Sequence, residues 1–375
     1  MTIDQSLFFG ALIFWGLSLS WLLTTAVCAI LQPYIRRPAA ALVVPISIVV
    51  PTRGARPGGG AVEELVAMRA LPALAYPVFE IILSVDRGQP GDGLALQTAY
   101  PSARVEVATI QSGGNPKVDA LASGAEQARH DCLVFFDDDI LVEGDCLQRL
   151  LAPLQAGAGL VSAAAIGTDP GNFWGEVDIA FMNGQFARLH LAGDVLGLNG
   201  ALGKAIMVRR ADLERVGGWR RTGGDCCEDA GLTRNIRAVG LEVALSDQPV
   251  RQPIGLQEFT GVWRRHRRWL SCRRRYLPAV FAGEAAFCTP LTSVAGGIVA
   301  SELAHPAALG MLATALIWCL ADCLLAGIKG WPVRWLSPWA WLVREILFLP
   351  LWLSALWANT DVWPTGAVST TKAPV

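Results

Sequence analysis

The most constraining feature of this sequence is an uncharged apolar run near its start. Residues 7–31 contain no Asp, Glu, Lys or Arg over 25 positions, and about 20 apolar residues suffice for a helix to cross a bilayer. A cleaved signal peptide is the alternative, but it needs a basic leader and a shorter apolar core. The chain starts MTIDQS, and Arg36 and Arg37 come only after the run. We therefore predict a retained anchor, with the chain from residue 36 onward in the cytoplasm.

A second apolar region covers the last hundred residues. Its segments 289–301, 306–328 and 338–358 are each candidate spans. The first is short for a bilayer and could be re-entrant, so two and three C-terminal spans both stay open. Asp322 lies inside the second segment, where a carboxylate is either a functional group or one paired within the bundle.

The composition agrees with a membrane protein that also carries a folded domain. Hydrophobic residues make up 53% of the chain and charged residues 17%, which excludes disorder and an ordinary soluble protein. The stretch between the two apolar regions has ordinary soluble composition and is long enough to bury its own core. We predict an anchor over 1–40, a cytoplasmic catalytic domain over 41–275 and a membrane bundle over 276–375.

The net charge and the cysteine content limit which binding partners and which cellular compartment are expected. The net charge of −1 gives no global argument for nucleic-acid binding, and we predict no nucleic-acid partner. The nine cysteines are odd in number, scattered and without zinc-site spacing. We therefore expect no disulfide framework and favour a reducing compartment.

The central stretch alternates short apolar runs with helical patterns. Strands are predicted at 45–51, 79–85, 104–110 and 131–136, and helices at 61–74 and 116–129, with a loop over 52–60. This alternation predicts a mostly parallel sheet wound with helices. Such sheets bind ligands beyond the carboxyl ends of their strands, where Asp86 and the run Asp137-Asp138-Asp139 both fall.

The acidic run has the chemistry of a cation site. Asp137 and Asp139 are two residues apart, so an extended backbone puts them on the same side. Oxygen ligands of this kind suit Mg²⁺ or Mn²⁺ shared with substrate phosphates. A solvated turn with a helix-capping Asp is the alternative.

A second acidic pair opens a later helical pattern. Glu228 and Asp229 precede the segment AGLTRNIRAVG. Asp229 is either the N-cap of that helix or a general base that deprotonates an acceptor hydroxyl.

An arginine-rich segment follows, with seven arginines among residues 263–275. A nucleic-acid patch is one interpretation, which the flanking apolar spans argue against. A helix bound to anionic lipid at the membrane surface is another. Arg265 and Arg268 are three apart and hence on one helical face, so they could also clamp a diphosphate, with Trp269 beside an acceptor.

Taken together, these motifs resemble the signature of processive and lipid-directed family 2 glycosyltransferases. The order is Asp86, Asp137-x-Asp139, Glu228-Asp229 and Arg265-x-x-Arg268-Trp269, with Asn115-Pro116-Lys117 and Gly203-Lys204 as further matches. The chain is most similar to the ceramide glucosyltransferase group, which includes hopanoid-associated enzymes, over roughly residues 1–360. The first residue of the last motif is Arg265 rather than Gln, and the acceptor lipid stays open.

The resemblance implies a GT-A fold and inverting transfer from a UDP-sugar to a lipid hydroxyl, with ceramide as the expected acceptor. It also implies a divalent cation, Mg²⁺ or Mn²⁺, and a bacterial inner membrane. Asp229 would be the catalytic base, and Asp137 and Asp139 would hold ribose and the metal. The remaining donor-binding residues would be Asp86, Lys117, Arg265, Arg268 and Trp269.

Several other functions remain open at this point. A hopanoid or polyprenyl phosphate could be the acceptor instead. A small processive polysaccharide synthase is disfavoured by the short C-terminal bundle. A catalytically inactive binding module would be expected to lose Asp229 or the Asp-x-Asp pair, and both are present.

Overall fold

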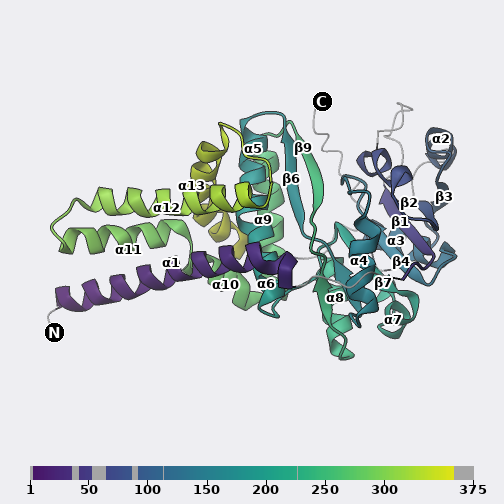
Figure 1. Cartoon of the computed structure of the whole chain (residues 1–375), viewed down its shortest axis with the longest axis horizontal. Helices are drawn as coiled ribbons and strands as arrows, with labels where there is room; N and C mark the ends of the chain where they lie inside the picture. Colours follow the sequence, from purple (N-terminus) through teal and green to yellow (C-terminus); the bar gives the residue numbers. More distant parts are fainter. Residues whose placement is uncertain are drawn as a thin grey trace.

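The computed structural model describes residues 3–35, 42–52, 65–86, 92–112, 114–225 and 227–358. Arg36 and Arg37, most of the predicted loop 52–60 and the C-terminal tail lie outside these residues. Figure 1 shows a sheet domain at one end, long helices at the other and a layer of helices between them. The predicted fold class, an α/β domain with apolar helices from both ends of the chain, is confirmed.

The sheet domain is built on seven strands in the order β3-β2-β1-β4-β7-β5-β8. Neighbouring strands are parallel, except that β7 runs antiparallel to β4 and β5. The four predicted strands are confirmed as β1 to β4, with β3 ending earlier than predicted. The strands are β1 Ile46–Thr52, β2 Phe79–Val85, β3 Arg104–Val107, β4 Cys132–Phe136, β5 Leu160–Ser162, β7 Ala205–Arg209 and β8 Val243–Leu245.

Both faces of this sheet are buried under helices. Along β1, Ile48 and Val50 belong to one apolar cluster and Val49 to another, as alternating side chains require. Helix α4 covers the first face, and α3 and α8 cover the second. The helices of this domain are α2 Asp92–Ala99, α3 Pro116–Gln127, α4 Cys146–Gln155, α7 Arg210–Arg215 and α8 Glu228–Ala238, with a 3₁₀ turn Trp219–Thr222.

The helix predicted over 61–74 is wrong in its described part. Residues 65–74 instead form two short 3₁₀ helices, Val66–Arg69 and Leu71–Ala73. Pro72 sits inside the predicted helix, where it lacks the N–H needed for a continuous α-helix and its ring clashes with the preceding turn. The apolar spacing there reflects burial of Met68 and Leu71 in the sheet core.

A second layer lies on the side of the sheet domain that faces the long helices. A two-stranded parallel sheet joins β6 Ala165–Pro170 to β9 Val250–Gly255. Beside it lie α5 Phe173–Ile179, a π-helix Ala180–Ala187, α6 Arg188–Val195, α9 Phe259–Tyr276 and α10 Pro278–Ala286. We call these helices the interface layer, because they separate the sheet domain from the long helices in Figure 1.

The apolar helices are α1 Ile3–Ile35, α11 Thr289–Glu302, α12 Ala307–Ile328 and α13 Ser337–Leu356. Within the part of the chain that the structure describes, three segments are long and apolar enough to cross a membrane, namely Gln5–Ile35, Ala307–Ile328 and Ser337–Leu356. The 14 residues of α11 measure about 21 Å, less than a bilayer core of about 30 Å. By this criterion the C-terminal region contributes two candidate spans rather than three.

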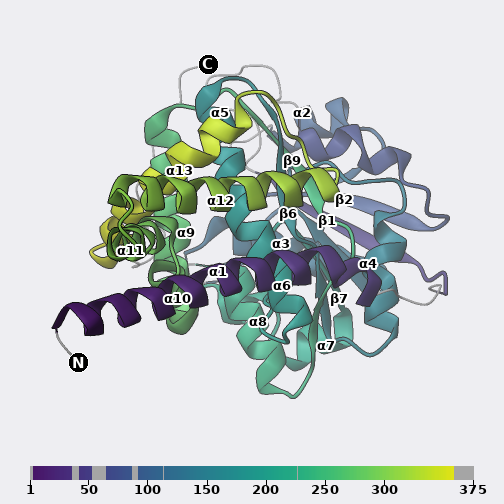
Figure 2. The same cartoon turned by 60° about the vertical axis from the view of Figure 1, so that its left-hand side comes forward.

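Helices α11 and α12 form a tight hairpin whose turn lies at the same end as the N-terminus (Figure 1). A methyl group on Gly310 would come within 2.3 Å of the Gly296 carbonyl oxygen, so only glycine allows this approach. Helix α13 crosses α12 in both Figure 1 and Figure 2 instead of running beside it. Asp322 of α12 forms an ion pair with Arg344 of α13 at 2.7 Å, so the interpretation as a paired carboxylate is confirmed.

Candidate active site

The carboxyl ends of β2 and β4 place acidic residues at one edge of the sheet, as predicted. Asp86 follows β2, and its backbone N–H donates to the carbonyl of Thr52 at the end of β1. Asp137 follows β4, and its N–H donates to the carbonyl of Lys204. Asp138 hydrogen-bonds Thr52, and burial beside its two neighbouring carboxylates raises its pKa to about 6.

Two lysines neutralise the Asp-x-Asp pair. Lys117 Nζ lies 2.7 Å from Asp137 Oδ1, and Lys204 Nζ lies 3.2 Å from Asp137 Oδ2 and 2.8 Å from Asp139. Burial disfavours the charge on Asp137, but the two lysines outweigh that cost and hold its pKa below the ordinary value. Gln252 donates from Nε2 to Asp139 at 2.7 Å, so both carboxylates are held in place.

Lys117 reaches this position because its helix starts just before it. The side chain of Asn115 accepts a hydrogen bond from the Lys117 N–H, and Pro116 occupies the first helical position. The ammonium group also lies 2.6 Å from Glu228 Oε1. Burial alone would lower the pKa of Lys117, but Asp137 and Glu228 raise it, so the side chain stays charged.

Asp229 lies in the first turn of α8, and its carboxylate is held by two backbone groups. The N–H of Gly203 donates to Oδ2 at 2.9 Å, and the N–H of Ala230 donates to Oδ1 at 2.8 Å. Burial and the nearby negative charge of Glu228 raise the pKa of Asp229 to about 6. The N-cap alternative is wrong, because the N-cap is Cys227 and Asp229 is already helical.

Gly203 shows how closely these groups converge. A methyl group at this position would lie 3.2 Å from Glu228 Oε1 and 3.4 Å from both Asp229 Oδ2 and Lys117 Nζ. A side chain here would crowd all three polar groups. Asp229, the predicted base, and Lys117, a predicted donor-binding residue, therefore lie close together around Gly203.

The arginine-rich segment forms α9 in the interface layer. Arg265 Nη1 pairs with the buried carboxylate of Asp178 on α5, which also accepts from His266 Nε2 at 2.7 Å. Arg268 is exposed. Trp269 packs edge-on against Phe186 and His266, with ring centroids 5.0 and 5.1 Å apart. Although Arg265 and Arg268 are three residues apart, the structure turns Arg265 toward α5.

Strand β9 connects α9 to the acidic pair. Gln252 and Ile254 are two residues apart and both buried, so they lie on the same face of the strand. Gln252 contacts Asp139, while Ile254 belongs to the apolar cluster that Trp269 packs against. The Arg-x-x-Arg-Trp segment is thus held beside the carboxyl edge of the sheet.

A disulfide between Cys227 and Cys272 adds a covalent link between α8 and α9. Cys227 precedes Glu228 and Asp229, and Cys272 lies one turn after Trp269. The sequence predicts no disulfide framework, and this pair is a disulfide that the prediction does not include. The sequence offered no signal, because the two cysteines are 45 residues apart and follow no known spacing.

The Asp137 and Asp139 carboxylates have the oxygen chemistry that Mg²⁺ or Mn²⁺ requires. Among the described residues, no group of three or more His, Cys, Asp or Glu side chains is placed to hold a metal by itself. Two carboxylates are enough protein ligands for such an ion when water and substrate phosphates supply the others. The side chain of Asp139 is 42% exposed, so it is accessible to such a shared ion once Lys204 moves aside.

The fold and this arrangement of carboxylates define a GT-A glycosyltransferase. The structure is similar to a mannosyltransferase from Pyrobaculum calidifontis solved with GDP-Man and Mn²⁺, with a TM-score of 0.51 and 16% identity. The alignment covers 95% of this chain and 99% of that one. The chain belongs to glycosyl transferase family 21, whose model matches residues 11–373.

Two curated relatives from Caenorhabditis elegans are similar to this chain. Ceramide glucosyltransferase 1 is 23% identical over 263 residues, and ceramide glucosyltransferase 3 is 22% identical over 264 residues. Each alignment covers 67% of this chain but only 55% and 56% of the relatives. The chain thus matches about half the length of these proteins.

Three residues near the site were not assigned a role by sequence reasoning. Lys204 directly precedes β7 and contacts both Asp137 and Asp139, and the Gly203-Lys204 motif is its signal in the sequence. Gln252 and Asp178 contact Asp139 and Arg265 across 113 and 87 residues of sequence. No short motif encodes contacts over such separations.

Proposed function

We propose that this protein transfers a sugar, with inversion, from a cytoplasmic UDP-sugar to a hydroxyl group of a membrane lipid, with a ceramide-type lipid as acceptor. The observation that carries the proposal is the position of Asp229. Its half-buried carboxylate lies beside the Lys117, Asp137 and Glu228 cluster, and Cys227, which directly precedes its helix, lies against Cys272 of α9 in the interface layer. The names of the curated relatives support the acceptor class.

The chemistry follows from the charges. Asp229 accepts the proton of the acceptor hydroxyl while the acceptor oxygen bonds to the anomeric carbon. The bond from that carbon to the diphosphate breaks, and the nucleoside diphosphate leaves with the electron pair on the face opposite the attack. Lys117, Lys204 and Arg268 supply positive charge for the diphosphate.

A divalent cation held by Asp137 and Asp139 would neutralise phosphate charge when bound. Lys204, which contacts both Asp137 and Asp139, would supply positive charge to a phosphate oxygen. Asp86, at the end of β2 and separated from β4 by β1, is proposed to bind the nucleotide base. Trp269 is proposed to line the acceptor side.

The membrane arrangement supports a cytoplasmic site. We propose that α1 crosses the bilayer with its C-terminal end at the cytoplasmic surface, as the placement of Arg36 and Arg37 predicts. The side chain of Gln32 near that end donates to Asp194 in the interface layer at 3.0 Å. The sheet domain would then stand on the cytoplasmic side of a bacterial inner membrane.

The test is lipid mass spectrometry on membranes that carry the protein. They are incubated with UDP-glucose, UDP-galactose, UDP-glucuronic acid, UDP-N-acetylglucosamine or GDP-mannose, and with ceramide, a hydroxylated hopanoid or a polyprenyl phosphate. The expected product is ceramide that has gained one sugar, absent with Asp229→Asn. A product on polyprenyl phosphate alone, or a growing polymer, would replace the proposed acceptor. Absence of both product and nucleotide release would refute the enzymatic function.

A further inference from the structure

Helix α13 packs against the interface layer along its whole length. At its start, Ser337 Oγ donates to Glu176 of α5 at 3.1 Å, and near its middle Arg344 Nη1 donates to the first carbonyl of the π-helix at 3.0 Å. Near its end, the carbonyl of Ser354 accepts from Arg267 Nε of α9 at 3.2 Å. The 20 residues of α13 measure about 30 Å. A helix that crossed a bilayer would therefore meet this layer at one end and leave it at the other.

Helices α1 and α12, in contrast, extend away from the interface layer. Their C-terminal halves contact α6, through Gln32 with Asp194 and through Asp322 with Arg188. Their other ends lie far from the sheet domain, where the N-terminus and the turn of the α11–α12 hairpin are found (Figure 1). Figure 1 shows α13 turned across these long helices, on the side of α5 and α9 from which they extend. Helix α13 therefore follows the boundary at which the long helices leave the rest of the protein.

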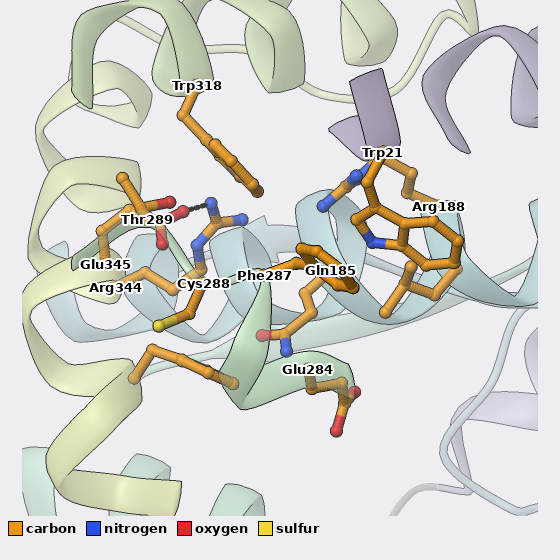
Figure 3. Close-up of a pocket in the computed structure, with 12 residues that line it drawn as sticks. Trp21, Gln185, Arg188, Glu284, Phe287, Cys288, Thr289, Trp318, Arg344 and Glu345 are labelled. Carbon is orange, nitrogen blue, oxygen red and sulfur yellow. Dashed lines mark ion pairs between the residues drawn. The ribbon is translucent and has the colours of Figure 1, made fainter. Parts of the chain in front are cut away.

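The charged residues of α13 lie on the side that faces the protein. Arg344 is buried and pairs with Glu345 of its own helix, as the dashed line in Figure 3 marks, and with Asp322 of α12 at 2.7 Å. These charges are near the middle of α13, which is the depth at which a charge in a membrane-crossing helix costs most. A helix that lies along the membrane surface avoids that cost, because its middle is no deeper than its ends.

The exposed residues of α13 carry no charge and share one face of the helix. They are Pro338, Trp339, Ile346, Pro350 and Leu353. The last three follow Trp339 by 7, 11 and 14 residues, which are about two, three and four helical turns. The opposite face belongs to the apolar cluster that α13 shares with α5, the π-helix and α9. The exposed stripe is thus an apolar surface that lipid or another protein has to cover.

Tryptophans flank this stripe at both ends of the helix. Trp335, just before α13, is 78% exposed, and Trp357, just after it, is 76% exposed. Tryptophan is enriched where proteins meet the boundary between lipid tails and headgroups. The segment 329–336, which precedes α13, contains Lys329 and Arg334 but no Asp or Glu, as expected of a connection on the cytoplasmic side. These features favour a bilayer surface, rather than a second protein, as the cover of the stripe.

We propose that α13 does not cross the membrane but lies in the plane of its surface, in the leaflet nearest the sheet domain. Trp339, Ile346 and Leu353 enter the boundary between headgroups and lipid tails, about 5–10 Å deep. Length and composition make α13 a candidate span, but its contacts with the interface layer at start, middle and end argue against a crossing. Both ends of α13 then lie on the side of the sheet domain. The inference goes beyond the proposed function, because it holds whichever sugar and lipid react.

The first test asks on which side of the membrane the two ends of α13 lie. Val333→Cys places a thiol before the helix, a cysteine appended after Val375 places one behind it, and Asp131→Cys marks the sheet domain at a side chain 98% exposed. Sealed vesicles of either orientation are treated with a membrane-impermeant maleimide. Mass spectrometry identifies the labelled peptides, so the native cysteines are distinguished from the new ones. All three positions should be labelled in the same vesicles, and labelling of the two ends of α13 from opposite sides would overturn the proposal.

The second test measures the depth of the exposed stripe in vesicles. A fluorescent unnatural amino acid replaces Trp339, Ile346 or Leu353, one at a time, and is quenched by nitroxide lipids labelled at shallow or deep tail positions. An in-plane helix gives the same depth at all three positions. In a crossing helix the depth would change by about 10 Å from each position to the next, because they are seven residues apart. The fluorophore in place of Leu94, which is 75% exposed on α2, is the matched control and should escape quenching.

The two tests together leave each outcome decisive. Stronger quenching by the shallow nitroxide at all three positions supports the proposal. A stepwise change of depth along α13 contradicts it, and so does the absence of quenching, which would mean that a protein surface covers the stripe. If the thiol of Val333→Cys is shielded from both sides, the depth measurement decides. Because the three fluorophores are introduced separately, a position that disturbs folding leaves two others for the comparison.

Discussion

Two clusters of ion pairs in this protein join basic side chains to aspartates in opposite settings. Around Asp137, the side chains of Lys117 and Lys204 are 26% and 19% exposed, and Asp139 is 42% exposed. Around Asp322, the side chain of Arg344 is 2% exposed and that of Asp322 is fully buried. Ion pairs within reach of water can be exchanged for a ligand at small cost, whereas buried pairs resist exchange. The first cluster is suited to binding a substrate, and the second to holding helices in place.

The backbone packed against Asp322 and Arg344 explains why this ion pair resists exchange. Gly184 of the π-helix faces it so closely that a methyl group there would come within 2.2 Å of Arg344 Nη1 and 2.8 Å of Asp322 Oδ2. Arg344 Nη1 also donates to the carbonyl of Ala180 at 3.0 Å. The charges are thus packed against helix backbone, where water cannot replace a lost partner.

The largest effect is expected at Asp229. Asp229→Asn removes the proposed base while keeping the shape of the side chain, and we expect turnover to fall by about 10²–10⁴-fold. UDP-sugar affinity should change little, because the carboxylate contacts Gly203 and Ala230 rather than the lysines. Turnover is followed by radiolabelled lipid product and affinity by isothermal titration. Loss of nucleotide binding with retained turnover would contradict the assignment.

A substitution in the buried cluster around Asp322 should lower the stability of the fold rather than the catalytic rate of the folded protein. Asp322→Asn removes the carboxylate that Arg188 and Arg344 share, and breaking a buried pair in this way costs about 3–5 kcal/mol. We expect a clear fall in the thermal unfolding midpoint, measured by tryptophan fluorescence in detergent. The double variant Asp322→Asn with Arg344→Met should recover part of it. Asp131→Asn, at a carboxylate 98% exposed, serves as the unaffected control.

A substitution in the exchangeable cluster should instead change ligand affinity. Lys204→Met removes the ammonium group that contacts both Asp137 and Asp139. A cation then competes with one positive charge fewer, so Mn²⁺ affinity without nucleotide should rise roughly ten-fold. Electron paramagnetic resonance of free Mn²⁺ measures this directly, with Lys329→Met as the control. Equal Mn²⁺ affinity of the Lys204→Met and Lys329→Met variants would show that Lys204 does not compete with the cation.

The smallest effect is a pH dependence. A general base must be deprotonated, and the pKa of Asp229 is raised to about 6 by burial and by Glu228. The value of kcat/KM should therefore rise between pH 5 and pH 7 and become constant at higher pH. Asp138 has a pKa of about 6 as well, so the profile is repeated with Asp138→Asn. The inflection should survive that change; if it disappears, Asp229 is not its source.

Sequence patterns predicted the parts of this protein that depend on neighbouring residues. The parallel strands and the acidic residues at their carboxyl ends follow from local apolar runs, and α3 follows from Asn115 and Pro116. The anchor follows from an uninterrupted apolar stretch. Each of these features is decided within about one element length, which is the range over which periodicity and capping act.

Contacts between distant segments could not be predicted in the same way. Arg265 was expected to face a diphosphate, but Asp178 on a separate helix offers a buried carboxylate that outcompetes water for it. The single helix expected over 61–74 is, in its described part, two 3₁₀ helices that meet at Ala70, shortly before Pro72. The disulfide and the contact between Gln252 and Asp139 depend on how α8, α9 and β9 come together. These outcomes are decided by tertiary packing.

Strand β9 fixes the spacing between the acidic pair and helix α9. Gln252 reaches the acidic pair and Ile254 supports Trp269, so their contacts with the acidic pair and with α9 are two residues apart along the strand, about 6.6 Å. A register slip of one residue would turn both side chains away together. Under the proposed function, the protein would thus hold the donor site at a fixed distance from the helix that carries Trp269. We expect it to choose among lipids by how far their reactive hydroxyl stands from the hydrocarbon surface, as much as by the chemistry of the headgroup.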